Sequence, residues 1–409
     1  MVPAEDGEGP RPPAGDDAAA TFGAAAIVHL VGHITPPVMG FLLPTLHAMH
    51  AAGYRQALLY VSGDWHAEVA LQVPHGVILV QVPDHRSPLR RSAALRAALE
   101  EFARRHPVSM LHLHGLLPGL AAVRWLRDDP RRAVDVYLSP HSSRAFGRPM
   151  LVRTIVGQLL RVGLGTNARH AIVNLVSEAS LMSRFSGMPA RLVENPVPQV
   201  FFDVVRNETP RPLVVSCNLE GQRAAVDRYA RIAVLLNSDQ LGISFNWVGA
   251  ADSEAAAELR AAGVGQFEVS TDESRARRLA TAWIYVAPTE ERGFPVRLAE
   301  AMAAGLPCVA LDTPSHRSLV VDGQTAFLCA DLRGLLECIA ALIDDAALRR
   351  RIGAAARSAV VARLSESVFR ERLMQAMGAT RPQAGDVPAI PAEASPVLAP
   401  IPTTEGHVA

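Results

Sequence analysis

The sequence predicts an α/β fold with two doubly wound domains, each built on a parallel β-sheet that helices cover on both faces. Short apolar runs alternate with longer segments of helical period along most of the 409 residues, and strands that are apolar throughout are typical of sheets buried on both faces. The alternation pauses in a proline-rich stretch and then starts again, which indicates a second domain of the same kind. The length agrees, because a single core seldom serves a chain of this size.

The first domain is expected over residues 23–204. Its helices are predicted to follow turn signals and include residues 38–52, 89–105 and 116–127. Its strands are predicted at residues 26–31, 57–62, 76–82, 109–112, 134–139 and 171–176.

The second domain is expected over residues 205–379, after a linker marked by prolines at positions 196, 198, 210 and 212. Its strands are predicted at residues 213–217, 243–248, 267–269, 283–287, 308–311 and 326–329. Ligands of doubly wound sheets bind at the carboxyl ends of the strands. We therefore expect the binding site in a central cleft between the two domains.

Both ends of the chain differ from this pattern. Residues 1–22 and 380–409 are rich in proline and alanine and contain few large apolar side chains. Such segments bury too little apolar surface to fold. We expect a disordered tail at each end.

The charges are balanced, with 40 basic and 40 acidic side chains, which argues against an electrostatic grip on nucleic acid by the whole protein. The sequence contains no lysine, so an anionic ligand must be held by arginine side chains or by backbone N–H groups. Four cysteines lie in the second half without metal or disulfide spacing. This fits reduced thiols in a reducing compartment.

An uncharged segment from Gly23 to Gly53 is long enough to resemble a membrane span. Histidines and a proline pair interrupt it, so we interpret it as a buried strand, a loop and a helix, and expect a cytoplasmic protein without a transmembrane segment. Arginines alternate with apolar residues between Arg148 and Arg161. This amphipathic pattern either lies on the cytoplasmic face of the inner membrane or packs its apolar side on the core.

The most informative segment is residues 286–311, in which a strand runs into a loop and then into a helix. The helix is expected to begin near Pro295, whose fixed φ suits a first helical turn. Free N–H groups at the start of such a helix can bind an anion. On spacing alone, Glu300 belongs either to this site or to the solvated face of the helix.

This segment resembles the signature of the retaining GT-B glycosyltransferases of family 4, in which a loop glutamate and Gly-Phe-Pro precede Leu-x-Glu-Ala-Met-Ala-x-Gly-x-Pro. The matching residues are Gly293, Phe294, Pro295, Leu298, Glu300, Ala301, Met302, Ala303, Gly305 and Pro307. Residues 320–328 and the strand end at Gly249 are similar to further parts of the family pattern. The resemblance implies two Rossmann-like domains that face a central cleft.

The resemblance also implies roles for residues of the second domain. Glu300 would bind the ribose of a nucleotide-sugar donor, with Gly249, Gly293, Phe294 and Pro295 nearby. The glutamate that the family places eight positions earlier falls on Arg292 here. Either Glu291 or Glu290 supplies that carboxylate to the donor sugar, with Glu291 preferred, or the sugar is bound differently.

Two cations of the family contact the donor diphosphate, and they fall on Asn218 and Arg223 in this sequence. Arg223 is the candidate for a bidentate phosphate contact that stabilises the leaving group; the alternative is a surface arginine in the first turn of a helix. Asn218 carries no charge. Arg292 is a second candidate cation, since it precedes the helix at Pro295.

Histidines stand where strands of the first domain are predicted to end. His112 and His114 would share one face of the sheet, but no third metal ligand stands at helical or hairpin spacing from them. We expect no metal and count His114 among the acceptor-binding candidates. His141 resembles the family histidine that meets the transferring sugar; a structural histidine is the alternative.

The loop after the first strand contains a single glycine where the family often has two, and His33 and Thr35 are candidate acceptor contacts there. Together these features predict a metal-independent, retaining hexosyltransferase that uses a nucleotide sugar. By resemblance, its acceptor is a glycan or a lipid-linked oligosaccharide of a bacterial surface polysaccharide. The alternative is a catalytically silent GT-B homologue that acts as a binding or scaffold protein; a sugar-nucleotide epimerase has no positive sequence feature.

Overall fold

The computed structural model describes residues 26–61, 72–129, 133–141, 150–217, 223–237, 242–289 and 293–378. The two expected tails lie outside this part of the chain, as do Asn218, Glu290, Glu291 and Arg292.

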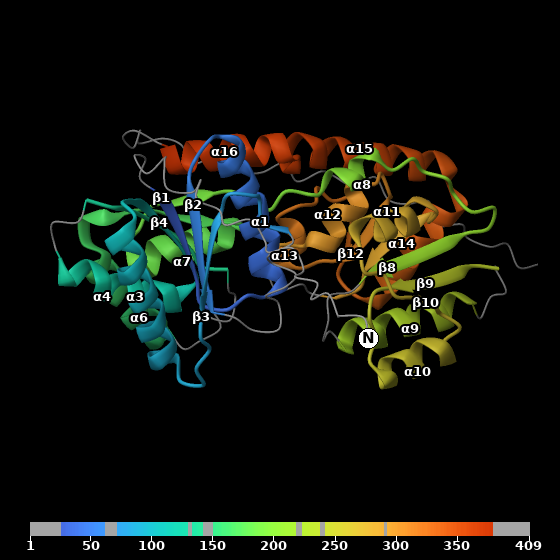
Figure 1. Cartoon of the computed structure of the whole chain (residues 1–409). Coiled ribbons are helices and arrows are strands. Elements are labelled where there is room, and N and C mark those ends of the chain that lie inside the picture. The colour runs from blue at the N-terminus through green and yellow to red at the C-terminus, as the bar shows by residue number, and fades with distance from the viewer. Residues whose placement is uncertain are drawn as a thin grey trace, which may run out of the picture.

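Two parallel sheets form the framework of the molecule (Figure 1). The first has the strand order β3-β2-β1-β4-β5-β6-β7, and the second has the order β10-β9-β8-β11-β12-β13. Both orders start from a central strand, run outward and then reverse, which is the doubly wound arrangement. The predicted α/β class with two doubly wound domains is confirmed.

The strands lie close to the predicted residues. In the first sheet they are β1 (Ala26–Val31), β2 (Gln56–Val61), β3 (Ile78–Val82), β4 (Val108–His114), β5 (Asp135–Ser139), β6 (Ala168–Val173) and β7 (Ala190–Leu192). In the second sheet they are β8 (Leu213–Cys217), β9 (Ser244–Val248), β10 (Gly265–Phe267), β11 (Ile284–Ala287), β12 (Cys308–Leu311) and β13 (Phe327–Cys329). Only β7 among these strands was not predicted, because a three-residue edge strand that is partly exposed lacks a buried apolar run.

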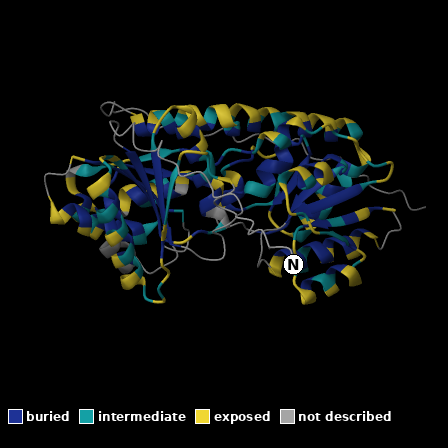
Figure 2. Ribbon diagram, viewed as in Figure 1, coloured by how far each residue is buried: buried dark blue, intermediate teal, exposed yellow. Residues whose placement is uncertain are grey.

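Helices cover both faces of the first sheet. One face packs on α3 (Pro88–Arg105), α4 (Leu116–Asp128), α6 (Met150–Leu164) and α7 (Val176–Ser186), and the other packs on α1 (Pro36–Ala51) and α16 (Glu366–Gly378). All six residues of β1 and of β2 are buried as a result (Figure 2). The uncharged segment that begins at Gly23 contains β1 and α1 in its described part, as expected.

The second sheet is covered in the same way. One face packs on α8 (Gln199–Asp203), α11 (Asp272–Ala280), α12 (Val296–Ala303) and α15 (Ala346–Leu364), and the other packs on α9 (Arg223–Asn237), α10 (Ser253–Ala261) and α14 (Leu332–Asp344). The short helix α13 (Pro314–Arg317) follows β12. All four cysteines are free thiols.

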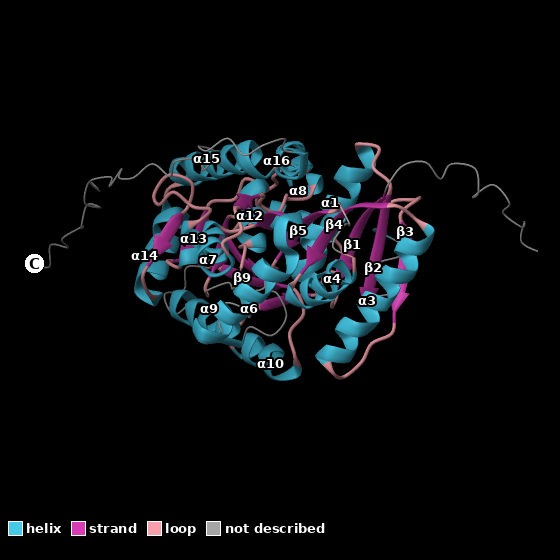
Figure 3. Ribbon diagram, turned by 90° about the vertical axis from the view of Figure 1, so that its left-hand side faces the viewer, coloured by secondary structure: helices cyan, strands magenta, loops and turns pink. Residues whose placement is uncertain are grey.

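The C-terminal helices cross from one domain to the other. Helix α15 packs on α12 of the second domain, whereas α16 packs on α1 and β6 of the first. Figures 1 and 3 show both helices along one side of the molecule. Residues 205–379, which were expected to form one unit, therefore supply a helix to the first sheet as well.

Polar contacts hold this crossing in place. The buried Glu194 carboxylate accepts hydrogen bonds from Arg363 Nε and from Arg372 Nη1, both at 2.9 Å, and Tyr137 donates its hydroxyl to the Met377 carbonyl at 2.7 Å. In the described part of the chain, no helix combines the length and the apolar character that a membrane crossing requires.

Candidate functional site

Four histidines gather at the centre of the first sheet. His29 on β1 lies directly opposite His112 on β4, and His114 follows two residues later on the same strand. His29 and His112 are completely buried, and His114 is 3% exposed. His141 follows the end of β5 with a φ of 46°, a left-handed conformation that turns the chain away from the strand.

Direct contacts join these side chains. His29 Nδ1 lies 3.3 Å from His114 Nε2, and His114 Nδ1 lies 2.9 Å from His141 Nε2. His112 Nε2 lies 2.9 Å from the Ser139 hydroxyl. The structure thus brings together the predicted His114 and His141 with His29, which sequence reasoning missed because it stands 85 residues before His114.

Burial keeps the four imidazoles neutral. Loss of solvation lowers the pKa of His29 and that of His141 to about 4. It also lowers the pKa values of His112 and His114 well below the ordinary range, and the neighbouring histidines add to this effect. Each ring therefore carries a single N–H at neutral pH.

Acid is expected to destabilise the protein through this cluster. In the unfolded chain His29 titrates near pH 6.5, whereas in the folded protein its pKa is about 4, so the unfolded state binds more protons between these values and stability falls as the pH falls. At pH 5 the loss for His29 is about 2 kcal/mol relative to pH 8. Urea unfolding at the two pH values measures it. A folded His29→Asn variant should lose this part of the dependence, and equal pH dependence in both proteins would contradict the assignment.

Three of these histidines approach metal-site geometry. His29, His112 and His114 each bring one nitrogen to within 4.8 Å of the others. His112 Nδ1 is buried and has no hydrogen-bond partner among the described residues. The third histidine is therefore His29 on the neighbouring parallel strand β1, which no local spacing in the sequence could indicate.

The predicted acceptor residues His33 and Thr35 lie just after the carboxyl end of β1. His33 is exposed and Thr35 is partly buried at the start of α1. The loop passes close to α4, because a side chain at Gly32 would meet Pro118 at 3.0 Å. Both residues stand at the strand edge that the sequence analysis proposed.

A buried carboxyl group that the sequence analysis did not consider lies at the same sheet edge. Glu178 is in the first turn of α7, which follows β6. Burial raises the pKa of Glu178 to about 7, although a hydrogen bond to the Asn174 backbone opposes the shift. This carboxyl group is therefore partly protonated near neutral pH. Its only sequence signal is an acidic residue in a helical first turn.

In the second domain, backbone N–H groups lie at the start of α12, where the Val296 N–H already donates to the Phe294 carbonyl at 2.9 Å. Gly293 has a φ of 103°, which only glycine adopts without strain, and Ser315 donates its hydroxyl to the Gly293 carbonyl at 2.6 Å. Phe294 is buried. Pro295 is the N-cap residue and makes no side-chain cap, and the first turn contains no acidic residue. These are the features of an anion-binding helix terminus.

Glu300 lies on this helix and is 2% exposed, which excludes the solvated position. Arg275 binds its two oxygens through Nε at 2.8 Å and Nη2 at 3.0 Å. Arg297 Nη1 lies 2.8 Å and 2.9 Å from the same oxygens. These four contacts occupy the acceptor sites of a carboxylate, so a ribose hydroxyl would have to displace an arginine to reach it.

Arg223 is engaged in a surface ion-pair network. Its Nε lies 2.8 Å from an Asp227 oxygen, and its Nη2 lies 2.6 Å from a Glu258 oxygen and 3.4 Å from a Glu254 oxygen. The side chain is 41% exposed. This position matches the alternative of a surface arginine rather than a free cation for a diphosphate.

Gly249 stands at the carboxyl end of β9 with a φ of 133°. Its N–H donates to the Phe267 carbonyl at 3.0 Å. The positive φ explains the glycine, because other side chains are strained in this conformation.

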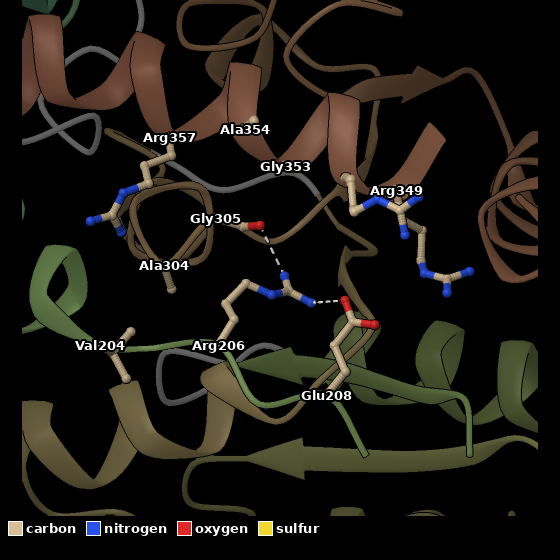
Figure 4. A pocket seen from close by; sticks show the side chains of 10 residues that line it. Val204, Arg206, Glu208, Ala304, Gly305, Arg349, Gly353, Ala354 and Arg357 are labelled. Atoms are coloured by element: carbon tan, nitrogen blue, oxygen red, sulfur yellow. Dashed lines mark hydrogen bonds and ion pairs between the residues drawn. The ribbon is translucent and has the colours of Figure 1, made fainter. Parts of the chain in front are cut away.

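An arginine-rich pocket of about 330 Å³ lies between the linker, the end of α12 and α15 (Figure 4). Three of its four arginines donate to backbone carbonyls. Arg206 Nη1 donates to Gly305 at 2.9 Å, and Arg357 Nη1 donates to Ala303 at 2.7 Å. In Figure 4 the Arg349 and Arg357 guanidinium groups point in opposite directions. The contacts of Arg206 and Arg357 satisfy carbonyl groups at the end of α12, and those of Arg349 satisfy carbonyl groups at the end of α14.

The second domain matches a known family. Residues 212–345 match the family described as Glycosyl transferases group 1. A GDP-mannose-dependent alpha-mannosyltransferase of Mycolicibacterium smegmatis is 35% identical over 159 residues, which is 37% of this chain and 40% of that protein. The match therefore spans about two fifths of the length of this curated relative.

Solved structures match over most of both chains. A glycosyltransferase from Rickettsia africae has a TM-score of 0.72 at 11% identity, covering 87% of this chain and 99% of its own. Anabaena Alr3699/HepE in complex with UDP has a TM-score of 0.67 at 13% identity, covering 86% and 99%. The predicted GT-B fold is thereby confirmed.

Proposed function

We propose that this protein is a glycosyltransferase that moves a hexose from a nucleotide-sugar donor to a hydroxyl group of a glycan or lipid-linked acceptor. The observation that carries the proposal is the family match over residues 212–345, which includes the uncapped start of α12. The mannosyltransferase relative favours GDP-mannose as the first donor to test, and the UDP complex of a structural neighbour favours UDP-sugars as the second.

In this proposal the second domain holds the diphosphate at the N–H groups of Gly293 and Phe294 and at those of the first turn of α12 other than Val296, whose N–H already donates to the Phe294 carbonyl. These dipoles stabilise the charge that develops as the bond from the sugar to the phosphate breaks. Arg292, Glu291 and Asn218 remain candidate donor contacts from the sequence and lie outside the described residues. This scheme needs no metal, because backbone dipoles and the candidate cation Arg292 compensate the charge of the diphosphate.

The first domain supplies the acceptor side. His141 lies next to the transferring sugar, and His33 and Thr35 contact the acceptor. The buried His114 acts through His141, because its two ring nitrogens already face His29 and His141. The anomeric configuration is retained, as in the family that the sequence resembles. Exposed Leu159 and Val162 beside Arg161 on α6 support peripheral contact with a membrane that carries the acceptor.

The test uses the full chain with GDP-mannose, UDP-glucose and other nucleotide sugars. Release of nucleoside diphosphate with one donor, at a rate that EDTA does not change, is the expected result. Arg223→Ala should keep that rate within about twofold, because an exposed ion pair contributes little.

A binding or scaffold role is the second candidate. It is favoured by the saturated Glu300 carboxylate and the paired Arg223, since neither offers a free group to a donor in this structure. A protein that shows neither diphosphate release nor a thermal shift with any nucleotide would support this role and overturn the transferase.

A further inference from the structure

A continuous chain of hydrogen bonds runs from α1 through the first sheet to His141. The Gln56 amide donates from Nε2 to the Leu46 carbonyl at 2.9 Å, and Gln56 Oε1 lies 3.1 Å from His29 Nε2. The contacts from His29 to His114 and from His114 to His141 continue it. Gln56 and His29 are almost completely buried, so water does not compete for these groups.

The Leu46 carbonyl fixes the direction of every proton in this chain. A carbonyl oxygen only accepts, so the Gln56 nitrogen faces it and Gln56 Oε1 is left as an acceptor. His29 then carries its proton on Nε2, and because a neutral imidazole has one N–H, its Nδ1 is an acceptor. The proton of His114 then lies on Nε2, which faces the acceptor Nδ1 of His29, and the proton of His141 likewise lies on Nε2, which faces Nδ1 of His114.

For the His29–His114 and His114–His141 pairs, the ring geometry agrees with hydrogen bonds rather than with a shared metal. The ring centroids of His114 and His141 lie 5.1 Å apart in nearly parallel planes, and those of His29 and His114 lie 5.6 Å apart. The N···N distances of these two pairs are 2.9 Å and 3.3 Å. In each pair the distance between the ring centroids exceeds the N···N distance by about two ring radii, so the two nitrogens lie close to the line between the ring centres. This is the direction of an N–H···N bond. Two nitrogens that shared a metal ion would point to a position beside that line.

We propose that Gln56, His29 and His114 are positioning residues that hold His141 as its Nε2–H tautomer and leave His141 Nδ1 as a hydrogen-bond acceptor. Such an acceptor binds a sugar hydroxyl, which donates, and disfavours a phosphate oxygen, which also accepts. The use of this acceptor for the transferring sugar rests on the proposed function. The tautomer itself does not, since the protein alone determines it.

The test is ¹⁵N NMR of the full chain labelled at histidine, at pH 7 and without substrate. His29, His114 and His141 should each show a protonated Nε2 and an unprotonated Nδ1, with single His→Asn variants to assign the signals. A protonated Nδ1 on His141 would overturn the proposal. The proposal would also be overturned if the purified protein held one equivalent of bound metal and if removing that metal with EDTA shifted the NMR signals of His29 and His114.

Two variants of Gln56 form a matched pair. Gln56→Glu in its protonated form donates to the Leu46 carbonyl and keeps an acceptor facing His29, so it should preserve the Nε2–H tautomer of His141. Gln56→Met has a similar length without an acceptor, so a second set of His141 signals should appear. The wild-type spectrum decides the proposal even if Gln56→Met does not fold.

The transfer reaction supplies the functional test. The reaction uses the donor identified by the test of the proposed function. In Gln56→Met, kcat should fall about tenfold without a matching change in donor KM, and in Gln56→Glu kcat should remain near the wild-type value. Equal kcat in all three proteins would overturn the role of the relay in transfer. A wild-type protein that transfers no sugar but shows the expected tautomers would overturn the proposed function alone, so the two failures are distinguishable.

Discussion

Replacing Glu300 by glutamine is expected to lower the free energy of unfolding by about 3 to 5 kcal/mol, because two buried arginines lose the charge that compensates them. Arg275 and Arg297 both contact this carboxylate, and all three side chains are largely buried. Arg275 retains a contact with Asp272, whereas Arg297 has no second acidic partner among the described residues. Urea unfolding followed by circular dichroism measures the change.

The control is Glu337→Gln. Glu337 forms an ion pair with Arg333 in which both side chains are well exposed, so its loss should change stability by less than about 0.5 kcal/mol. A Glu300→Gln variant as stable as this control would mean that the carboxylate is solvated and free to meet a ligand.

Replacing His141 by asparagine is expected to reduce the transfer rate by about 100-fold or more, because the ring that faces the sugar in the proposed reaction is lost. Asparagine tolerates the left-handed φ of this position, so the backbone turn should persist. The measurement is nucleoside diphosphate release at saturating donor, with thermal unfolding to confirm the fold.

The matched control for this change is His75→Asn, at an exposed position before β3. It should leave the rate unchanged. A His141→Asn enzyme within threefold of the wild type would assign His141 a structural role, which is the alternative that the sequence analysis kept open.

Much of the fold was predictable because strand position is a local property. β1, β8 and β12 begin and end at the predicted residues, since a short apolar run between turn signals identifies a buried strand. The predicted start of α12 at Pro295 was accurate to one residue for the same reason. The crossing of α16 to the first sheet was not predictable, because its helical pattern does not state which sheet it covers.

The site was less predictable than the fold, since its side-chain partners come from distant positions. Arg275 reaches Glu300 across 25 residues, and His29 reaches His114 only because β1 and β4 are neighbours in the sheet. No regular spacing along the sequence predicts either pairing. Glu300, His114 and His141 could therefore be named as candidates from the sequence, but which of their lone pairs were already in use could not.

The crossing of the C-terminal helices restricts how the domains move. The chain crosses from the first domain to the second at residues 193–204 and crosses back where α15 meets α16. The two crossings lie side by side, because the Val197 N–H donates to the Leu364 carbonyl at 2.9 Å. Two adjacent chain crossings allow one domain to rotate relative to the other about the line through both crossings, and they oppose twisting or sliding of the domains. In the proposed reaction, closure of the domains over a donor should thus be a single-axis rotation, with Val197 and Leu364 nearly stationary while the strand ends of the two sheets approach each other.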